Sequence, residues 1–201
     1  GREWDCEQSK SCGKKRRSLM IKYVYLTIFC FLILNANAKN KENIINNLKN
    51  TKNFNFDFEQ NINKKIEKGN CVIEYPKKIF CKYLGKNNKI LVSNGNSLVI
   101  KTKASYYLYP LEKTPLNFIL DKKYLINKIY NLEERVIDES FINYKINENG
   151  IEINIFFDNQ SFNLIGWQTK DAYQNLNITF LSSIKKNEHI NENLFKLPLR
   201  N

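Results

Sequence analysis

Hydrophobic and polar residues alternate along most of the chain after residue 39, and this period of two predicts β-strands. The clearest run is Phe54 to Ile62, where three phenylalanines fall on one face of a half-buried strand. Asn-Gly pairs at 94–95 and 149–150 each separate two such runs, and this dipeptide favours tight hairpin turns because both residues tolerate positive φ. The pattern therefore predicts hairpins over residues 71–83, 89–101 and 141–158, and further strands at 105–109, 161–168 and 175–183.

Helical spacing of apolar residues occurs in two short segments. Glu42 to Lys49 places two isoleucines and a leucine on one side, and Thr114 to Asp121 begins with Thr114 as an N-cap and Pro115 at the first helical position. Neither segment has enough apolar residues to form its own core, so both must pack on the sheet. We therefore predict an α+β fold, with a strongly curved antiparallel sheet covered by short helices. The sheet is an incomplete β-barrel of about 9–11 strands under two or three helices.

The first forty residues follow a different pattern. A short basic start at Met20 to Lys22 precedes an uncharged apolar run, Tyr23 to Leu34, and the small residues that a signal peptidase accepts end at Ala38. A transmembrane helix needs about 20 apolar residues, and this run is shorter. We predict a signal peptide over 20–38, with an uncleaved membrane anchor as the alternative. Residues 1–19 are an extension of doubtful origin, and residues 39–201 form one domain that is soluble in the periplasm after cleavage.

Charge and cysteine content narrow the class of protein. The formal net charge is +12, but the lysines are scattered rather than clustered on one stripe, so we do not expect nucleic-acid binding. Cys71 and Cys81 follow the signal peptide, and an even pair in an exported protein favours a disulfide. If Cys71 faces Cys81 across two strands, Ile73 faces Ile79 on the same side of the sheet.

The sequence offers little catalytic chemistry. It contains no nucleophile elbow, no glycine-rich phosphate loop and no zinc-binding spacing, so we expect no enzyme, no cofactor and no metal. Asp158 and Asp171 stand at strand ends, Glu133 and Glu134 in a connection, and His189 in a polar tail. The apolar residues on the strands, in contrast, are more than two short helices can cover. A curved sheet under a helical lid can enclose a cavity for an apolar ligand.

Four segments, in this order, resemble the LolA family of periplasmic lipoprotein carriers. They are Phe54 to Gln60 (FNFDFEQ), Gly69 to Tyr83, Ile90 to Ile100 (ILVSNGNSLVI) and Thr114 to Leu120. The resemblance implies a non-catalytic monomer with a hydrophobic cavity between sheet and lid. This cavity takes the acyl chains of lipoproteins from an inner-membrane ABC transporter, and the carrier passes them to an outer-membrane receptor. The residues expected to line this cavity are Phe54, Phe56, Phe58, Ile73, Tyr75, Ile79, Tyr83, Leu91, Leu98, Ile100, Tyr107, Leu116, Ile119, Leu120, Phe157 and Trp167.

The chain departs from the family pattern at the hairpin. Tyr75 stands before Pro76 where the family has an arginine that ties the empty lid shut, and Cys71 and Cys81 replace a leucine and a tryptophan. We assign Tyr75 as the lid latch and expect its hydroxyl to donate to a backbone carbonyl of the lid. Three alternatives stay open: the outer-membrane receptor of the same fold, which lacks support because no Cys follows the signal, a general periplasmic lipid-binding protein, and a secreted hydrolase with a carboxylate in the cavity.

Overall fold

A computed structural model describes residues 39–137, 140–170 and 175–200. Residues 41–201 form one compact unit. The predicted signal peptide, the extension over 1–19 and Asp171 lie outside the described residues. None of the helices in the described ranges is long and apolar enough to cross a membrane.

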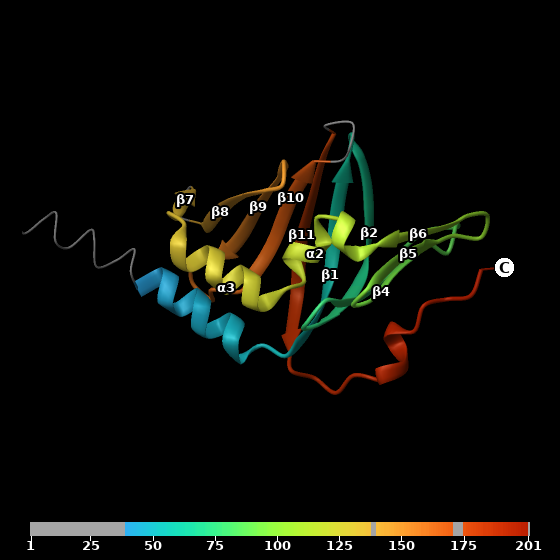
Figure 1. The fold of residues 1–201 in the computed structure, drawn as a ribbon, viewed down its shortest axis with the longest axis horizontal. Coiled ribbons are helices and arrows are strands. Elements are labelled where there is room, and N and C mark those ends of the chain that lie inside the picture. Colours follow the sequence, from blue (N-terminus) through green and yellow to red (C-terminus); the bar gives the residue numbers. More distant parts are fainter. Residues whose placement is uncertain (1–38, 138–139, 171–174, 201) are drawn as a thin grey trace, which may run out of the picture. The chain divides into compact units, whose positions relative to one another are not determined.

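Eleven antiparallel strands form one curved, open sheet, which confirms the predicted fold class (Figure 1). Their order across the sheet is β6-β5-β4-β3-β2-β1-β11-β10-β9-β8-β7, so β1 and β11 join two runs of consecutive hairpins. The strands are β1 (Asn53–Ile62), β2 (Lys65–Glu74), β3 (Lys78–Tyr83), β4 (Ile90–Asn94), β5 (Ser97–Lys101), β6 (Tyr106–Pro110), β7 (Arg135–Ile137), β8 (Phe141–Glu148), β9 (Ile151–Asp158), β10 (Leu164–Lys170) and β11 (Leu176–Lys186).

The hairpin turns follow the predicted chemistry, with two corrections. Asn149 and Gly150 both have positive φ, at 50° and 77°, as predicted. The turn between β4 and β5 lies one residue later than predicted, at Gly95 and Asn96. The reason is that the Asn94 side-chain oxygen accepts hydrogen bonds from the backbone N–H groups of residues 96 and 97, so Asn94 is the last residue of β4. Strand β2 starts at Lys65 rather than near residue 71, after a turn whose two residues, 63 and 64, have φ of 49° and 68°.

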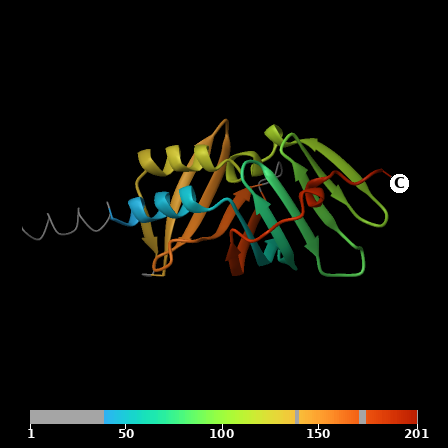
Figure 2. The ribbon, with the colours of Figure 1, turned by 90° about the horizontal axis from the view of Figure 1, so that it is seen from below.

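Helices cover one face of the sheet (Figures 1 and 2). The helix over residues 39–50 was predicted, and it buries two isoleucines and a leucine, Ile44, Ile45 and Leu48. Helix α2 (Leu116–Ile119) was also predicted, but Thr114 does not cap it. A 3₁₀ turn, η1 (Leu111–Lys113), precedes Thr114, and the Thr114 hydroxyl donates a hydrogen bond to the Leu111 carbonyl of that turn, at 2.8 Å.

The helix α3 (Lys122–Asn131) and strand β7 were missed in the sequence. The Asp121 side chain caps α3 by accepting the Tyr124 N–H, at 3.1 Å, and Leu125 and Ile129 are fully buried one turn apart. An acidic cap followed by apolar residues at helical spacing is a signal that was present in the sequence. After β11 the chain runs along β3 and β4, where the 3₁₀ turn η2 (Glu192–Phe195) contacts both strands (Figure 2).

The cysteine hairpin has the predicted register. Cys71 pairs with Cys81, Ile73 with Ile79 and Glu74 with Lys78, and the two cysteines form the predicted disulfide. Both cysteines and both isoleucines are buried on the face that the helices cover, whereas Lys78 and Glu74 form an ion pair, at 3.4 Å. Alternation along both strands thus directs one row of side chains into the core.

Candidate functional site

An apolar cavity of about 200 Å³ lies between α2 and the covered face of the sheet. The disulfide Cys71–Cys81 forms part of its wall. The predicted lining residues that do line it come from β1, β3, β4, β5, β10 and the lid helix α2: Phe58, Ile79, Tyr83, Leu91, Leu98, Ile100, Leu116, Ile119 and Trp167.

The other predicted lining residues lie elsewhere. Five of them are buried in the core and do not line the cavity: Phe54, Phe56, Ile73, Leu120 and Phe157. Tyr75 borders a separate gap of about 20 Å³ near the helix over residues 39–50, and Tyr107 is 52% exposed on β6. Strand alternation identifies the covered face, but it does not tell which residues on that face are separated by a cavity and which are in contact.

Polar side chains at the cavity were not predicted. Gln60 is the fourth residue of the Phe54-Phe56-Phe58 row, so its position on the covered face followed from the same alternation. It accepts a hydrogen bond from the Tyr83 hydroxyl and donates one to the Thr179 hydroxyl, each at 3.1 Å. The side-chain oxygen of Asn177 also borders the cavity and is buried without a hydrogen-bond partner among the described residues.

A glycine allows two aromatic rings to meet at one end of the cavity. Gly69 on β2 lies between Phe58 on β1 and Tyr83 on β3. A Cβ atom at this position would lie 2.2 Å from the Lys82 carbonyl oxygen and 2.7 Å from the Phe58 ring. Because Gly69 has no side chain, the Phe58 and Tyr83 rings pack edge to face with centroids 4.9 Å apart.

The lid is attached to the hairpin turn through Lys77. The Lys77 N–H donates to the carbonyl of Leu120, at 2.8 Å, immediately after α2, and the Ser93 hydroxyl donates to the Lys77 carbonyl, at 2.9 Å. The Lys77 ammonium also lies 3.6 Å from the carboxylate of Asp121, the residue that caps α3. These contacts connect the turn between β2 and β3 with β4, with the end of α2 and with the start of α3.

The hydrogen bond predicted for Tyr75 is absent. Its hydroxyl is buried and has no hydrogen-bond partner among the described residues, and burial raises the pKa of this hydroxyl. The Tyr75 ring packs against Phe54, with centroids 6.0 Å apart, and the ammonium of Lys122 on α3 lies 5.6 Å from its centroid. Tyr75 therefore contacts α3 through its ring, beneath the Lys122 ammonium, and not through a hydrogen bond of its hydroxyl.

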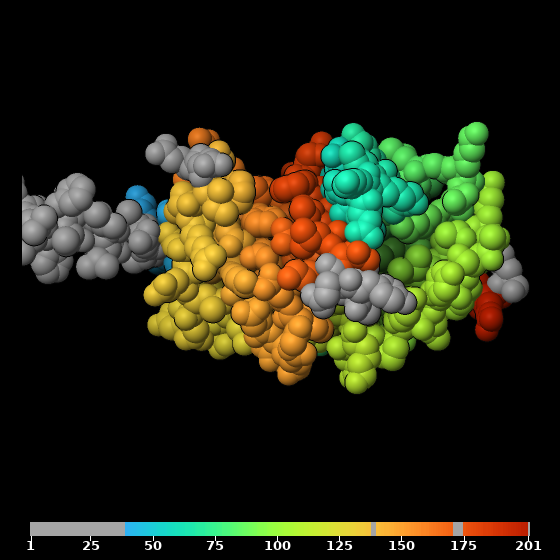
Figure 3. All heavy atoms as spheres, turned by 90° about the horizontal axis from the view of Figure 1, so that it is seen from above, coloured from blue at the N-terminus to red at the C-terminus, as the bar shows by residue number. Residues whose placement is uncertain are grey.

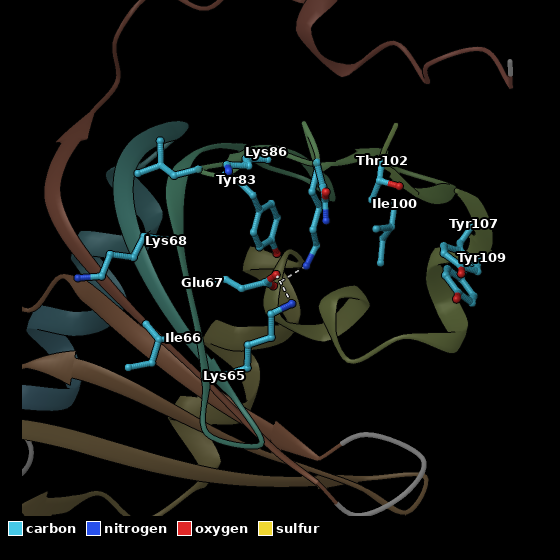
Figure 4. A pocket seen from close by; sticks show the side chains of 14 residues that line it. Lys65, Ile66, Glu67, Lys68, Tyr83, Lys86, Ile100, Thr102, Tyr107 and Tyr109 are labelled. Carbon is cyan, nitrogen blue, oxygen red and sulfur yellow. Dashed lines mark hydrogen bonds and ion pairs between the residues drawn. The ribbon is translucent and has the colours of Figure 1, made fainter. Parts of the chain in front are cut away.

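A second, larger cleft of about 810 Å³ lies outside the first cavity, and Tyr83 and Ile100 line both. Figure 3 shows the surface hollowed between the β1–β2 hairpin and the strands β5 and β6. The cleft is bordered by lysines of β2 and of the β3–β4 connection and by two tyrosines of the edge strand β6 (Figure 4): Lys65, Lys68, Lys86, Lys89, Tyr107 and Tyr109.

Glu67 is the one carboxylate among the residues that line this cleft. Its two ion pairs, with Lys89 at 2.6 Å and Lys65 at 3.2 Å, are the dashed lines in Figure 4. Burial raises the pKa of Glu67, but the hydrogen bonds and charges of Lys89 and Lys65 outweigh burial, so the pKa lies below its ordinary value of 4.5. The Lys89 ammonium also lies 4.0 Å from the centroid of the Tyr83 ring.

The residues considered for catalysis do not come together. Asp158 ends β9, where its carboxylate accepts the backbone N–H groups of Gln160 and Ser161, and His189 is exposed in the tail. Glu134 accepts a hydrogen bond from the Tyr144 hydroxyl, at 3.2 Å, beside β8. Among the described residues, no group of three or more His, Cys, Asp or Glu side chains is placed to hold a metal ion.

Comparison with known proteins gives one family. The model of the outer membrane lipoprotein carrier protein LolA family matches residues 49–198. No curated protein sequence matches the chain. Among solved structures, LprF from Mycobacterium bovis is similar at 12% identity and a TM-score of 0.43, over 79% of this chain and 96% of LprF.

Two further solved structures are similar at the same level. The lipoprotein LppX from Mycobacterium tuberculosis has 12% identity and a TM-score of 0.42, over 78% of this chain and 98% of LppX. A LolA superfamily protein from Nitrosomonas europaea has 7% identity and a TM-score of 0.39, over 73% of this chain and 90% of that one.

Proposed function

Because the chain belongs to the LolA family of outer membrane lipoprotein carrier proteins, we propose that it is a non-catalytic carrier that binds the acyl chains of a lipoprotein between its lid and its sheet. In this proposal an inner-membrane ABC transporter supplies the lipoprotein and an outer-membrane receptor accepts it. The carrier acts in the periplasm as a monomer.

The observation that supports the proposal is the apolar cavity under α2. Its volume of about 200 Å³ is smaller than the ~300–1,000 Å³ of typical ligand pockets. Acyl chains therefore require α2 to move away from the sheet, and the same apolar side chains that now pack against the lid would then contact the cargo. Transfer of each CH₂ group from water is worth about 0.8 kcal/mol, so a lid that competes with the cargo keeps binding reversible.

The proposal is tested with a fluorescent tripalmitoyl-cysteinyl lipopeptide. Leu91 lines the cavity and is half-buried, so Leu91→Trp fills the cavity without forcing a large side chain into the closed core. We expect this variant to bind the lipopeptide at least about tenfold more weakly, a loss of about 1.4 kcal/mol. Val136→Trp, on the exposed strand β7, is the matched control and should bind as the unaltered protein does.

The two variants separate the possible results. Unchanged binding by Leu91→Trp, with thermal unfolding like that of the control, would show that the acyl chains do not enter this cavity. Absence of lipopeptide binding by the unaltered protein would reject the carrier function. Mass spectrometry of the lipids that copurify with the protein gives an independent measurement of the same cargo.

A further inference from the structure

The outer cleft and the inner cavity are neighbours separated by two side chains. Tyr83 and Ile100 line both spaces, Tyr83 from β3 and Ile100 from β5. Tyr83 is held on the inner side by its hydrogen bond to Gln60 and on the outer side by the Lys89 ammonium, 4.0 Å from its ring centroid. A ligand chain that leaves the inner cavity past these two residues would enter the cleft directly.

The charge of the cleft is unbalanced. Glu67 forms ion pairs with both Lys65 and Lys89. Lys68 extends away from the other lining side chains in Figure 4 and forms its ion pair with Glu59, at 2.8 Å. Lys86 is exposed and has no ionic partner among the described residues. Three ammonium groups therefore face one carboxylate, and the excess of positive charge favours an anionic ligand.

Apolar surface lies beside these charges. Tyr107 and Tyr109 stack with ring centroids 6.5 Å apart and are 52% and 42% exposed, and Ile66 and Leu84 are 55% and 69% exposed. A small inorganic anion would use the lysines but leave these side chains in water. A ligand with a charged group attached to a hydrocarbon chain would use both.

We infer that the lysine cleft binds the anionic headgroup of a lipid whose acyl chain runs past Tyr83 into the inner cavity. The inference rests on the proposed function, because it requires the inner cavity to take an acyl chain, and it adds anionic lipids to the acylated lipoproteins as a second class of ligand. A phosphate or carboxylate at the headgroup lies between Lys86 and Lys89, and the start of the chain contacts Ile100. The carrier then distinguishes anionic lipids from neutral and zwitterionic lipids that have the same chain.

The test compares two single-chain lipids with the same acyl chain, lysophosphatidylglycerol and lysophosphatidylcholine. One lysine near an anionic lipid is worth about fivefold in affinity, so two excess charges give a preference of roughly twenty-five-fold for lysophosphatidylglycerol. Lys86→Gln combined with Lys89→Gln should reduce this preference to about one. Lys123→Gln, an exposed lysine on α3 away from the cleft, is the matched control and should keep it.

Each outcome has a distinct meaning. If both lipids bind equally to the unaltered protein, the headgroup inference is wrong although the cavity takes acyl chains. If neither lipid nor the lipopeptide binds, the proposed function itself fails. If glycerol phosphate without an acyl chain binds the cleft as tightly as the lysophospholipid, the cleft is a free-anion site and the inference is again wrong. A preference that survives in the double variant would remove Lys86 and Lys89 from recognition.

Discussion

Truncation of a lid side chain should strengthen cargo binding if lid closure competes with cargo. Leu120 follows α2, is fully buried, and does not line the cavity, so Leu120→Ala removes packing of the closed lid without removing a lining residue. A fully buried Leu→Ala change costs about 2–5 kcal/mol. The ion pair of Lys77 with Asp121 is partly exposed on both sides and is worth at most about 1 kcal/mol.

These magnitudes predict the change in affinity. The apparent dissociation constant is the intrinsic value divided by the fraction of molecules with an open lid. When the open form is a minor state, loss of 2 kcal/mol from the closed form raises that fraction about thirtyfold and lowers the apparent dissociation constant by the same factor. Leu120→Ala should therefore bind the lipopeptide about thirtyfold more tightly, whereas Lys77→Met should change affinity by less than about fivefold.

Fluorescence titration with the lipopeptide measures this effect, and a second core variant controls for general destabilisation. Ile142 on β8 is also fully buried but does not line the cavity, so Ile142→Ala should lower the midpoint of thermal unfolding as Leu120→Ala does without changing affinity. Weaker binding by Leu120→Ala, or the same affinity as Ile142→Ala, would refute competition between lid and cargo.

Three further changes test the structure around the site. Tyr75→Phe should leave the free energy of unfolding unchanged or raise it by about 1 kcal/mol, since the buried hydroxyl has no hydrogen-bond partner among the described residues. If urea unfolding showed that the variant is less stable by more than about 1 kcal/mol, the hydroxyl would have to form a hydrogen bond. Replacement of Cys71 and Cys81 by serine should cost about 2–3 kcal/mol, because the disulfide closes a loop with a sequence separation of 10; an unchanged urea midpoint would contradict this. The pKa of Glu67 is lowered, so its charge stabilises the fold above pH 4.5, and this contribution is lost as the pH falls through the lowered pKa. Glu67→Gln should therefore lose less free energy of unfolding than the unaltered protein when the pH is lowered through this range.

Local sequence signals predicted the strands of the sheet but not the shape of the cavity. The Phe54-Phe56-Phe58 alternation and the Asn149-Gly150 turn each depend on a few neighbouring residues, and both have the predicted structure. The size of the cavity depends instead on how closely residues from distant strands approach under α2. The lysine cleft was missed because the predicted hairpin began at residue 71, whereas β2 starts at Lys65 and brings Lys65 and Lys68 beside the connection that follows β3.

The lid is attached to the sheet although Tyr75 carries no charge and its hydroxyl makes no hydrogen bond among the described residues. The backbone N–H of Lys77 bonds to Leu120, and a backbone bond forms whatever side chain stands at position 75. Ile119 and Leu120, at the end of α2, are fully buried against the sheet, and each buried side chain contributes more than a partly exposed charge pair does. The closed lid is therefore stabilised chiefly by apolar packing, which acyl chains can replace with similar contacts. In the proposed carrier, a charged latch would add a cost of opening that the cargo could not offset in this way, so an uncharged residue at position 75 would favour exchange between lid and cargo.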